Sequence, residues 1–404
     1  MNGNRISVLH AVTDSKSTVL MRGQLAYLRA NGFAPALLSS PGKELIQIGT
    51  QEGYPVFGVA MKREISPLHD LLSLFDLWKL LRRIRPVICN SGTPKAGLLV
   101  GFAAWLTRVP CRIYTLRGLR LETAKGAKRA ILAITEKIAC LTAHRVICVS
   151  ASLRERAIVL GLVVPRKTVL LGSGSSNGVD PGRFELTPEN AALAATLRQT
   201  LGILPNQPVI GFVARFTRDK GLPELITAFQ AIRRQSRDAV LLLVGDYEEG
   251  DPVPENVKDK IKSEQGIRWV GATSQIELYY LIMNVFVLPT HREGLPNTIL
   301  EAQAAGLPVV TTTATGARDA IDDGITGLLV PVGDAQKLAE AVLSLLSDPL
   351  KMQLMGRLGR ERVLSQFRNE TVWNALVSLY RSILTERGYR PPDSYAEVRC
   401  AQTP

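Results

Sequence analysis

Short apolar runs alternate with amphipathic stretches through the first 150 residues of the chain. Six apolar runs are predicted to be strands, at residues 6–9, 36–38, 56–59, 87–89, 112–115 and 146–149. Four stretches with helical spacing fall between them, at 19–31, 67–84, 94–107 and 123–143. Alternation of this kind predicts a parallel sheet that is covered by helices on both faces.

The alternation begins again after residue 206. It predicts strands at 209–213, 239–245, 268–270, 285–289, 307–310 and 327–330, and helices at 221–235, 274–283 and 334–347. A section rich in Gly, Ser, Asn and Pro (172–206) separates the two halves, and two more helices are expected at 351–365 and 370–386. We therefore predict an α/β chain of two doubly wound, Rossmann-like domains that face each other across a cleft.

The domain bounds follow from these patterns. We expect domains at residues 1–184 and 185–365, then a C-terminal helix at 366–388 that returns to the first domain. Residues 389–404 are expected to be a disordered tail.

Composition limits the class of protein and shows one strong asymmetry. With 404 residues and 46% hydrophobic content, the chain has room for two or three ordinary domains. Its net charge of +13 is uneven, because residues 1–184 carry +16 and the remainder carries −3. So basic a half favours a polyanionic partner, either nucleic acid or an anionic membrane surface. Aromatic content of 6% and the lack of a known RNA- or DNA-binding pattern disfavour nucleic acid.

The cysteines and the N-terminus bear on the compartment. Five cysteines show no Cys-x-x-Cys pair and no His/Cys metal spacing, which indicates buried thiols in a reducing cytoplasm. The first residues run directly into a strand, so no signal peptide is apparent.

Residues 293–301, with the sequence EGLPNTILE, carry the clearest chemical signal. They follow the strand at 285–289 and run into a helix, so Glu293 and Glu301 flank a Gly/Pro loop at the carboxyl end of a strand. In open parallel sheets this edge binds ligands, and a new helix N-terminus there favours an anion. A carboxylate beside an anion site is electrostatically acceptable when a sugar lies between it and the phosphates, because the sugar hydroxyls then donate hydrogen bonds to the carboxylate.

Two cations follow the first strand of the second half. Arg215 and Lys220 lie five residues apart across a turn, and both are able to reach one diphosphate. Arg offers a planar fork of donors and Lys a point charge. The alternative is a pair of solvated surface cations.

With this layout, the chain resembles the retaining glycosyltransferases of GT-B fold known as family 4, or glycosyl transferases group 1, of the exopolysaccharide and O-antigen type. The resemblance covers nearly the whole length and is most specific in the second half. Its motifs are Arg215 to Gly221, the Glu-x7-Glu segment 293–301, the segment 176–180 (SNGVD), and 326–330 (TGLLV).

The resemblance implies a role for each motif residue. The first domain would bind the acceptor and the second the nucleotide-sugar donor, a UDP-sugar in the family's common case. Glu293, Arg215 and Lys220 would be catalytic, and Glu301 would hold the ribose hydroxyls. The remaining donor-binding residues would be Gly294, Leu295, Pro296, Asn297 and Thr298.

The expected chemistry needs neither a cofactor nor a metal. Fixed cations stabilise charge on the leaving diphosphate, and no Asp-x-Asp motif ends a strand; Asp322-Asp323-Gly324 is expected to be a loop. The family's outcome is retention of anomeric configuration, with the leaving phosphate able to take the acceptor's proton.

The first half departs from the family in two places. Where many members have Gly-Gly after the first strand, this chain has residues 13–18 (TDSKST), and Ser15 becomes a candidate for phosphate or acceptor binding. Where many have His-Gly, this chain has Arg117-Gly118, and an Arg is neither a base nor an acceptor. We expect Arg117 either on a phosphate of donor or acceptor or in a structural role; Lys95 and His10 are further candidates, although a core or loop role is favoured for His10.

Two basic segments suggest a membrane surface. Residues 71–85 combine Leu, Phe and Trp with a cationic end, and residues 117–129 hold five cations and one acid. The first segment is equally consistent with a core helix. We expect an enzyme at the cytoplasmic face of the cell membrane, acting on a lipid-diphosphate-linked or polysaccharide acceptor. A nucleotide-sugar epimerase of the same fold and a basic nucleic-acid-binding protein are the alternatives, and the sequence fixes neither the base nor the sugar.

Overall fold

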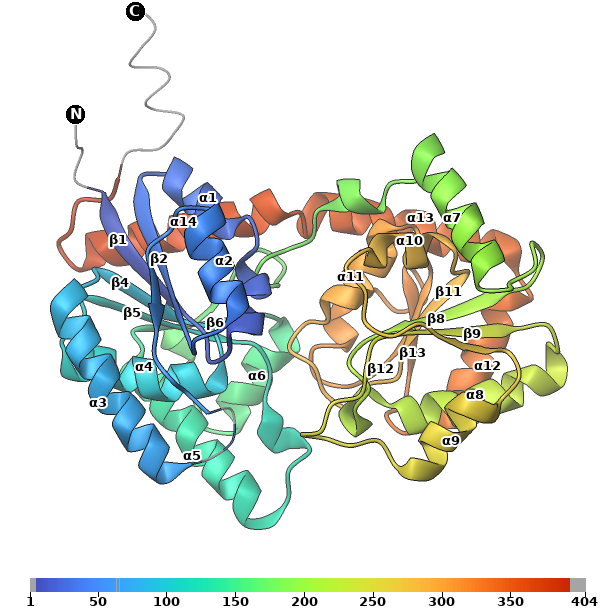
Figure 1. Ribbon diagram of the computed structural model, residues 1–404, viewed down its shortest axis with the longest axis horizontal. Coiled ribbons are helices and arrows are strands. Elements are labelled where there is room, and N and C mark those ends of the chain that lie inside the picture. Colours follow the sequence, from blue (N-terminus) through green and yellow to red (C-terminus); the bar gives the residue numbers. More distant parts are fainter. Residues whose placement is uncertain (1–4, 63, 65, 393–404) are drawn as a thin grey trace, which may run out of the picture. The chain divides into compact units, whose positions relative to one another are not determined.

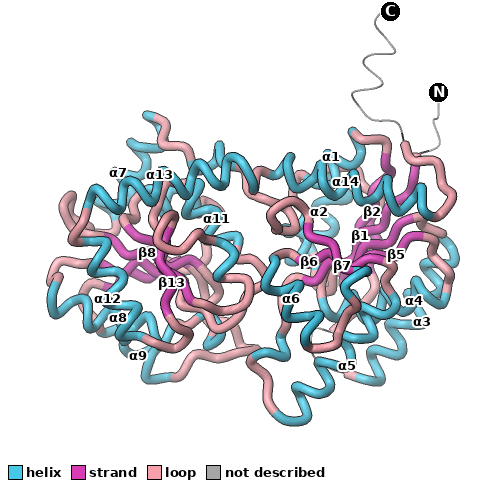
Figure 2. The backbone as a smooth tube through the Cα atoms, turned by 180° about the vertical axis from the view of Figure 1, so that it is seen from behind, coloured by secondary structure: helices cyan, strands magenta, loops and turns pink. Residues whose placement is uncertain are grey.

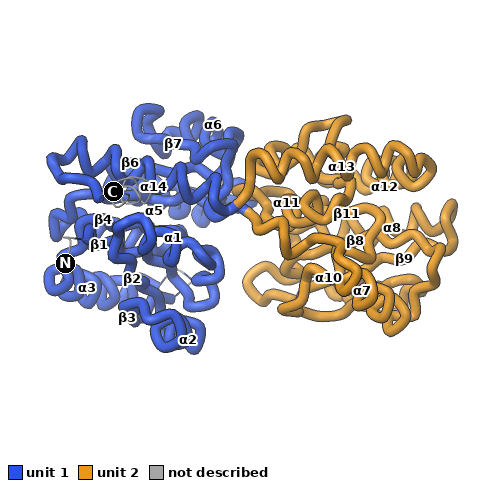
Figure 3. Tube along the Cα trace, turned by 90° about the horizontal axis from the view of Figure 1, so that it is seen from above, with its two compact units in different colours: residues 1–178, 369–404 blue, residues 179–368 orange. Residues whose placement is uncertain are grey.

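In residues 5–62, 64 and 66–392, which this computed structural model describes, thirteen strands form two separate parallel sheets (Figure 1). The chain divides into two units, unit 1 from Met1–Gly178 with Asn369–Pro404 and unit 2 from Val179–Arg368 (Figure 3). The first change of unit comes at residue 178 rather than 184, and the second at 368 rather than 365. Residues 179–184 belong with unit 2 because Phe184 packs edge-on against Tyr280, with ring centroids 5.5 Å apart.

Unit 1 contains a seven-stranded sheet of order β3-β2-β1-β4-β5-β6-β7. Its strands are β1 (Ile6–Ala11), β2 (Phe33–Ser39), β3 (Val56–Gly58), β4 (Ile88–Ser91), β5 (Cys111–Leu116), β6 (Arg145–Cys148) and β7 (Thr168–Leu170). Its helices are α1 (Gln24–Ala30), α2 (Lys43–Gln51), α3 (Pro67–Ile84), α4 (Pro94–Leu106), α5 (Gly126–Thr142), α6 (Ala151–Val159) and α14 (Asn369–Glu386).

Unit 2 contains a six-stranded sheet of order β10-β9-β8-β11-β12-β13. Its strands are β8 (Val209–Val213), β9 (Val240–Val244), β10 (Ile267–Trp269), β11 (Val285–Leu288), β12 (Val309–Thr312) and β13 (Gly327–Val330). Its helices are α7 (Pro188–Thr200), α8 (Leu222–Gln235), α9 (Glu255–Ser263), α10 (Ile276–Leu281), α11 (Asn297–Ala304), α12 (Ala335–Leu346) and α13 (Pro349–Gln366).

Helices cover both faces of each sheet. In unit 1, α1 and α14 lie on one face and α3, α4 and α5 on the other (Figure 2). Each face has its own apolar cluster: Leu77, Leu81 and Val100 belong to one, and Leu376 and Tyr380 to the other. In unit 2, α8 packs against α12, and α11 packs against α13. The central strands β8, β9, β11 and β12 are buried along their whole length, as expected for strands covered on both faces.

The predicted strands are all present, but the helix prediction was incomplete. Helices α2, α6, α7 and α9, and strand β7, had not been predicted, and α7 occupies part of the section taken as a boundary. The helix predicted at 19–31 was wrong in extent. A short 3₁₀ helix, η1 (Ser15–Met21), precedes α1, and Gly23 between them has φ = 77°, which interrupts helical geometry.

The C-terminal helix prediction falls on an observed element. Helix α14 belongs to unit 1, where Val372, Leu376 and Tyr380 enter the core beside Phe33 and Ile113. Part of the predicted tail, residues 393–404, lies outside the described residues.

Candidate active site

The strand order of unit 2 reverses between β8 and β11. The chain leaves β8 for β9 and β10 on one side and returns to β11 on the other side of β8. Ligands of open parallel sheets bind outside the carboxyl ends of the strands at such a reversal. The two predicted donor segments, 214–221 and 289–297, follow β8 and β11, so the fold places both at this point.

Backbone contacts lock these two segments together. The amide of His291 donates to the carbonyl oxygen of Asp219 at 2.8 Å, and the Thr290 hydroxyl donates to the same oxygen at 2.9 Å. Gly221 has φ = 74°, and a Cβ there would collide with the carbonyl of Pro289. Only glycine therefore permits both this turn and this approach of the two loops.

Lys220 and Glu293 meet at this junction. The Lys220 ammonium forms an ion pair with the Glu293 carboxylate, and the two side chains are 20% and 12% exposed. The amide of Glu293 donates to the carbonyl of Thr315 at 2.9 Å, which ties its loop to the segment after β12. The structure thus brings together a cation and a carboxylate that lie 73 residues apart in sequence.

The loop between Glu293 and helix α11 leads into an open helix end. Gly294 and Pro296 are buried, and Leu295, Asn297 and Thr298 are half-buried. Helix α11 begins at Asn297, no side chain caps it, and its first turn contains no acid. Its N-terminal amides and dipole therefore favour an anionic group.

Glu301 lies on the second turn of α11 and is held by a tyrosine. The Tyr280 hydroxyl is 2.9 Å from Oε2 of Glu301 and 3.3 Å from the carbonyl oxygen of Thr298. Burial raises the pKa of Glu301, while the hydrogen bond from Tyr280 and the charge of Arg183 act in the opposite direction. Tyr280 thereby orients the carboxylate and favours its charged form.

Arg215 does not join Lys220. Its guanidinium forms an ion pair with Glu248 in the loop after β9, and its side chain is 59% exposed. The two cations predicted to share one diphosphate are thus paired with different carboxylates.

Unit 1 has the same kind of reversal between β1 and β4, and neutral side chains gather there. The Thr115 hydroxyl donates to Oδ1 of Asn90 at 2.9 Å, and Nδ2 of Asn90 donates to the Tyr380 hydroxyl at 2.8 Å. That hydroxyl is 3.3 Å from Nε2 of His10. Burial, followed by the charge of Arg117, lowers the pKa of His10 to about 3, so this histidine is neutral at physiological pH.

Arg117 lies beside this network at the end of β5. Its Nη1 donates to the carbonyl of Gly92, while its buried Nε has no hydrogen-bond partner among the described residues. A cavity at this point, with room for about one water molecule, is lined by Arg117, His10, Asn90 and Thr115. Burial lowers the pKa of Arg117 to about 10, which leaves it charged at neutral pH. Within the described part of the chain, this guanidinium has no carboxylate partner.

Ser15 and Lys95 are engaged within unit 1. The Ser15 hydroxyl donates to Oε2 of Glu44 at 2.6 Å. Lys95 forms an ion pair with Asp70 at 2.6 Å, with side chains 10% and 16% exposed, and so links the start of α4 to the first turn of α3. In the structure Ser15 and Lys95 therefore make contacts between elements within unit 1.

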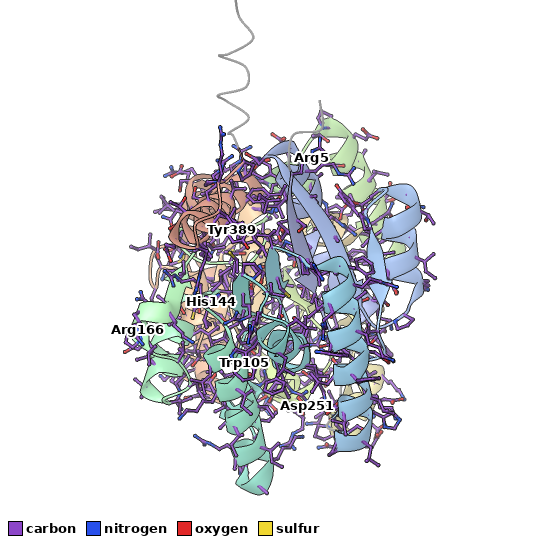
Figure 4. All side chains as sticks on the ribbon, turned by 90° about the vertical axis from the view of Figure 1, so that its left-hand side faces the viewer. Arg5, Trp105, His144, Arg166, Asp251 and Tyr389 are labelled. Atoms are coloured by element: carbon purple, nitrogen blue, oxygen red, sulfur yellow. The ribbon has the colours of Figure 1, made fainter. Side chains whose placement is uncertain are left out.

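The opposite, amino edge of the unit 1 sheet contains a basic groove that holds none of the predicted site residues. It is lined by Trp105, His144 and Tyr389, which lie along one side of the unit in Figure 4, together with Arg108, Arg112 and Arg387. Burial first, and then the charges of Arg112, Arg387, Lys167 and Arg145, lower the pKa of His144 to about 3.

Across residues 5–62, 64 and 66–392, no three His, Cys, Asp or Glu side chains are grouped as a metal site. Asp322 and Asp323 lie in the turn before β13, where the amide of Ile325 donates to the carbonyl of Asp322 at 3.0 Å, as expected for a loop.

Sequence reasoning missed the residues that hold the site in place. Asp219 bridges the two loops and also pairs with Arg292 at 2.5 Å, while Tyr280 holds Glu301. The only sequence signal for Asp219 was its place inside the Arg215–Gly221 motif. Tyr280 and Tyr380 resemble ordinary core positions of their helices, so nothing in the sequence marked them.

Comparisons with known proteins bear on the family and the fold of the chain. Residues 207–348 match the family described as glycosyl transferases group 1, and residues 18–174 match the glycosyl transferase 4-like domain. The chain is 39% identical over 379 residues to the capsular polysaccharide biosynthesis glycosyltransferase CapM of Staphylococcus aureus, covering 94% of this chain and 98% of CapM. It is 27% identical over 308 residues to the Escherichia coli UDP-Gal:alpha-D-GlcNAc-diphosphoundecaprenol alpha-1,3-galactosyltransferase, covering 76% and 78% of the two chains.

Solved structures give the same fold. Anabaena HepE, in a complex with UDP and glucose, superposes with a TM-score of 0.77 at 19% identity, over 94% of this chain and all of HepE. Sucrose-phosphate synthase from Thermosynechococcus elongatus superposes with a TM-score of 0.76 at 20% identity, over 94% of this chain and all of the synthase. The fold is therefore GT-B, as the sequence predicted.

Proposed function

The chain belongs to the group 1 glycosyltransferases, and from this premise we propose that it moves a sugar from a UDP-linked donor to a lipid-diphosphate-linked or polysaccharide acceptor. The transferred group is a hexosyl or N-acetylhexosaminyl residue, its anomeric configuration is retained, and the product is a precursor of a cell-surface polysaccharide. The names of the S. aureus and E. coli relatives support the pathway and the acceptor class, and the UDP held by HepE supports the base.

The observation that carries the proposal is the meeting of Lys220 and Glu293 at the strand reversal of unit 2. A donor diphosphate placed between the Lys220 ammonium and the open N-terminus of α11 receives positive charge from both. Its sugar then lies beside Glu293, whose carboxylate accepts hydrogen bonds from sugar hydroxyls. Glu301, held by Tyr280, accepts from the ribose hydroxyls at the other end of the nucleotide.

The chemistry follows from the charges. The bond between the anomeric carbon and the diphosphate oxygen breaks, and the anomeric carbon bonds to the acceptor oxygen on the same face. Negative charge grows on the departing diphosphate, where fixed cations stabilise the transition state. The acceptor's proton passes to the diphosphate, so neither a protein base nor a metal takes part in the proposed step.

Lys220 and Arg215 have unequal parts in this scheme. Lys220 is largely buried at the strand reversal, and fixed charges act most strongly where water is excluded. Arg215 is exposed and paired with Glu248, so it reaches the diphosphate only by exchanging that carboxylate for phosphate.

For unit 1 we propose that Arg117 binds a phosphate of the acceptor. The Arg117 side chain is half-buried, and its buried Nε has no hydrogen-bond partner among the described residues, which is costly unless an anion accompanies it. Arg binds phosphate with two parallel hydrogen bonds. The neutral His10, Asn90 and Tyr380 add no negative charge that would repel such a phosphate.

The test is a transfer assay with purified full-length protein, a panel of UDP-, GDP- and ADP-sugars, and a diphosphoundecaprenol-linked sugar acceptor. Acceptor-dependent release of UDP, with a product whose anomeric configuration matches the donor's, supports the proposal. Epimerisation of a nucleotide sugar without acceptor, or transfer only from GDP- or ADP-sugars, contradicts it.

A further inference from the structure

Helix α3 exposes its largest apolar side chains. Leu68, Leu71, Leu72 and Phe75 are 79%, 66%, 66% and 52% exposed, whereas Leu77 and Leu81 of the same helix are buried in the core. The helix therefore has one apolar side in the protein and another in contact with solvent. Single exposed apolar residues are ordinary, but four within eight positions of one helix indicate an interaction surface.

Helix α5 extends this feature. Ile131 and Ile134 are 42% and 60% exposed. Helix α4 contacts both α3 and α5, so the three helices form one layer on one face of the unit 1 sheet (Figures 1 and 2). We call the six exposed residues Leu68, Leu71, Leu72, Phe75, Ile131 and Ile134 the α3/α5 surface.

Cations accompany the α3/α5 surface. Every residue from Lys125 to Ile131 is exposed, and this segment holds Lys125, Lys128 and Arg129. On α3, the Lys79 ammonium lies 4.1 Å from the centre of the Phe75 ring, and exposed Arg82 and Arg83 follow. The surface is thus both apolar and basic.

The cations at the start of α5 are electrostatically unfavourable where they lie, at the N-terminus of a helix. Lys125 is the N-cap, Lys128 and Arg129 follow in the first turns, no side chain caps the helix, and its first turn contains no acid. Positive side chains at the positive end of a helix dipole repel it, so an external anionic partner relieves this arrangement. Arg82 and Arg83, in contrast, occupy the favourable last turn of α3.

We propose that the α3/α5 surface docks unit 1 onto an anionic lipid bilayer. An in-plane contact of this kind buries Leu and Phe side chains in the acyl boundary while Lys and Arg contact the phosphates. No helix among the described residues is long and apolar enough to cross a bilayer, so the contact is made at the interface. The charge of +16 in residues 1–184 complements such a lipid surface.

If the proposed function holds, the position of the α3/α5 surface also brings Arg117 close to a lipid-linked acceptor. Helices α3 and α5 connect parallel strands, so both begin at the carboxyl edge of the sheet, where Arg117 lies. Docking through their first turns places that edge next to the lipid headgroups. A lipid-linked diphosphate then reaches Arg117 without leaving the bilayer.

The proposal is tested by flotation of the full-length protein with two kinds of vesicle, phosphatidylcholine alone and phosphatidylcholine mixed with phosphatidylglycerol. The apolar variant is Leu71→Gln/Leu72→Gln/Phe75→Ser, and the charge variant is Lys125→Glu/Lys128→Glu/Arg129→Glu. Their matched controls lie in unit 2: Leu350→Gln/Leu354→Gln at exposed leucines of α13, and Arg234→Glu/Arg237→Glu/Lys262→Glu at exposed cations.

We expect the unmodified protein and both controls to float with the mixed vesicles only, and each α3/α5 variant to lose at least about tenfold in partitioning. Retained binding in both variants overturns the proposal, as does equal loss in the controls. A concentration-dependent dimer in light scattering that only the apolar variant abolishes would assign the surface to a second copy of the chain and also overturn it. Melting curves verify that the variants are folded. Flotation needs neither donor nor acceptor, so its failure is distinguishable from failure of the proposed transfer reaction.

Discussion

The two sheets reverse their strand order in the same way, but different chemistry lies at the two reversals. In unit 2, between β8 and β11, the cation Lys220 is paired with the carboxylate of Glu293. In unit 1, between β1 and β4, the neighbouring side chains are neutral, and nearby Arg117 has no carboxylate partner among the described residues.

This difference matches two ligands of different kinds. A nucleotide sugar presents both phosphates and hydroxyls, so its site needs a cation together with carboxylates that accept from hydroxyls. The diphosphate of an acceptor presents negative charge alone, and a carboxylate beside it would repel it. From this comparison we propose that the donor binds to unit 2 and the acceptor phosphate to unit 1, and the following predictions test that proposal.

The largest effect is expected at Lys220. Replacement Lys220→Ala removes the half-buried cation that we propose contacts the departing diphosphate, and we expect kcat/KM for transfer to fall about 10²–10³-fold. Steady-state kinetics with saturating acceptor measure this loss. Lys258→Ala is the control, because Lys258 is half-buried to a similar extent but pairs with the exposed Glu255 on α9. A Lys220→Ala variant within a factor of about two of the control would break the donor assignment.

Replacement of Arg117 should cause a smaller loss of activity, which appears in the KM for the acceptor and not in the KM for the donor. Charge-assisted hydrogen bonds contribute about 1.5–3 kcal/mol, so Arg117→Ala should raise the KM for a diphosphate-linked acceptor about 10–100-fold. Arg117→Lys should recover part of it, because the charge returns without the planar fork. Exposed Arg166→Ala serves as the control. Should the KM for the UDP-sugar rise instead, Arg117 belongs to the donor site and the comparison between the units fails.

Replacement of Tyr280 tests whether Glu301 binds the nucleotide. In Tyr280→Phe the Glu301 carboxylate loses its hydroxyl donor, and a lost hydrogen bond of about 1 kcal/mol should weaken UDP binding about fivefold. Fluorescence or calorimetric titration of UDP measures the change. The affinity for uridine monophosphate should fall by the same factor, because UDP and uridine monophosphate contain the same ribose. An unchanged affinity would show that Glu301 does not hold the nucleotide.

His10 and His291 should respond to acid with opposite signs. The pKa of His10 is lowered to about 3 by burial, so below about pH 6.5 the unfolded chain binds a proton that the folded chain does not. Unit 1 should therefore lose about 1 kcal/mol of unfolding free energy between pH 7 and about pH 5.5, and a His10→Asn variant should lose less. Urea unfolding at several pH values measures the difference. Equal acid sensitivity of the two proteins would show that His10 titrates normally.

The hydrogen bond that Nε2 of His291 donates to Glu224 raises the pKa of His291 in unit 2. Its stabilising contribution is therefore fully present below pH 6.5 and is lost as pH rises through the raised pKa. His291→Asn should destabilise the protein more at pH 6 than at pH 8, by an amount smaller than the His10 effect. A destabilisation that is the same at both pH values would show that the Glu224–His291 ion pair does not stabilise the protein.

The sequence predicted the fold well because its main signal is local. Mostly apolar runs of three to seven residues marked every strand except β7. The less apolar helices α7 and α9 were missed because each buries only one or two apolar residues, Ala194 in α7 and Val257 and Ile261 in α9.

Sequence spacing predicted only the local part of the candidate site. Glu293 and Glu301 were predicted together because a short loop and the first turns of one helix join them. The pairing of Lys220 with Glu293, and of Arg215 with Glu248, depends on the order of strands in the sheet, which periodicity does not encode. The same holds for Tyr380, which reaches the unit 1 network from a helix 290 residues beyond Asn90.

The central claim is that unit 2 holds the donor diphosphate and that Arg117 of unit 1 does not. Isothermal titration of UDP into the unmodified protein, Lys220→Ala and Arg117→Ala tests it most directly. We predict that Lys220→Ala loses at least about tenfold in affinity, while Arg117→Ala keeps the affinity of the unmodified protein. Loss of UDP binding in Arg117→Ala with retention in Lys220→Ala would contradict the account.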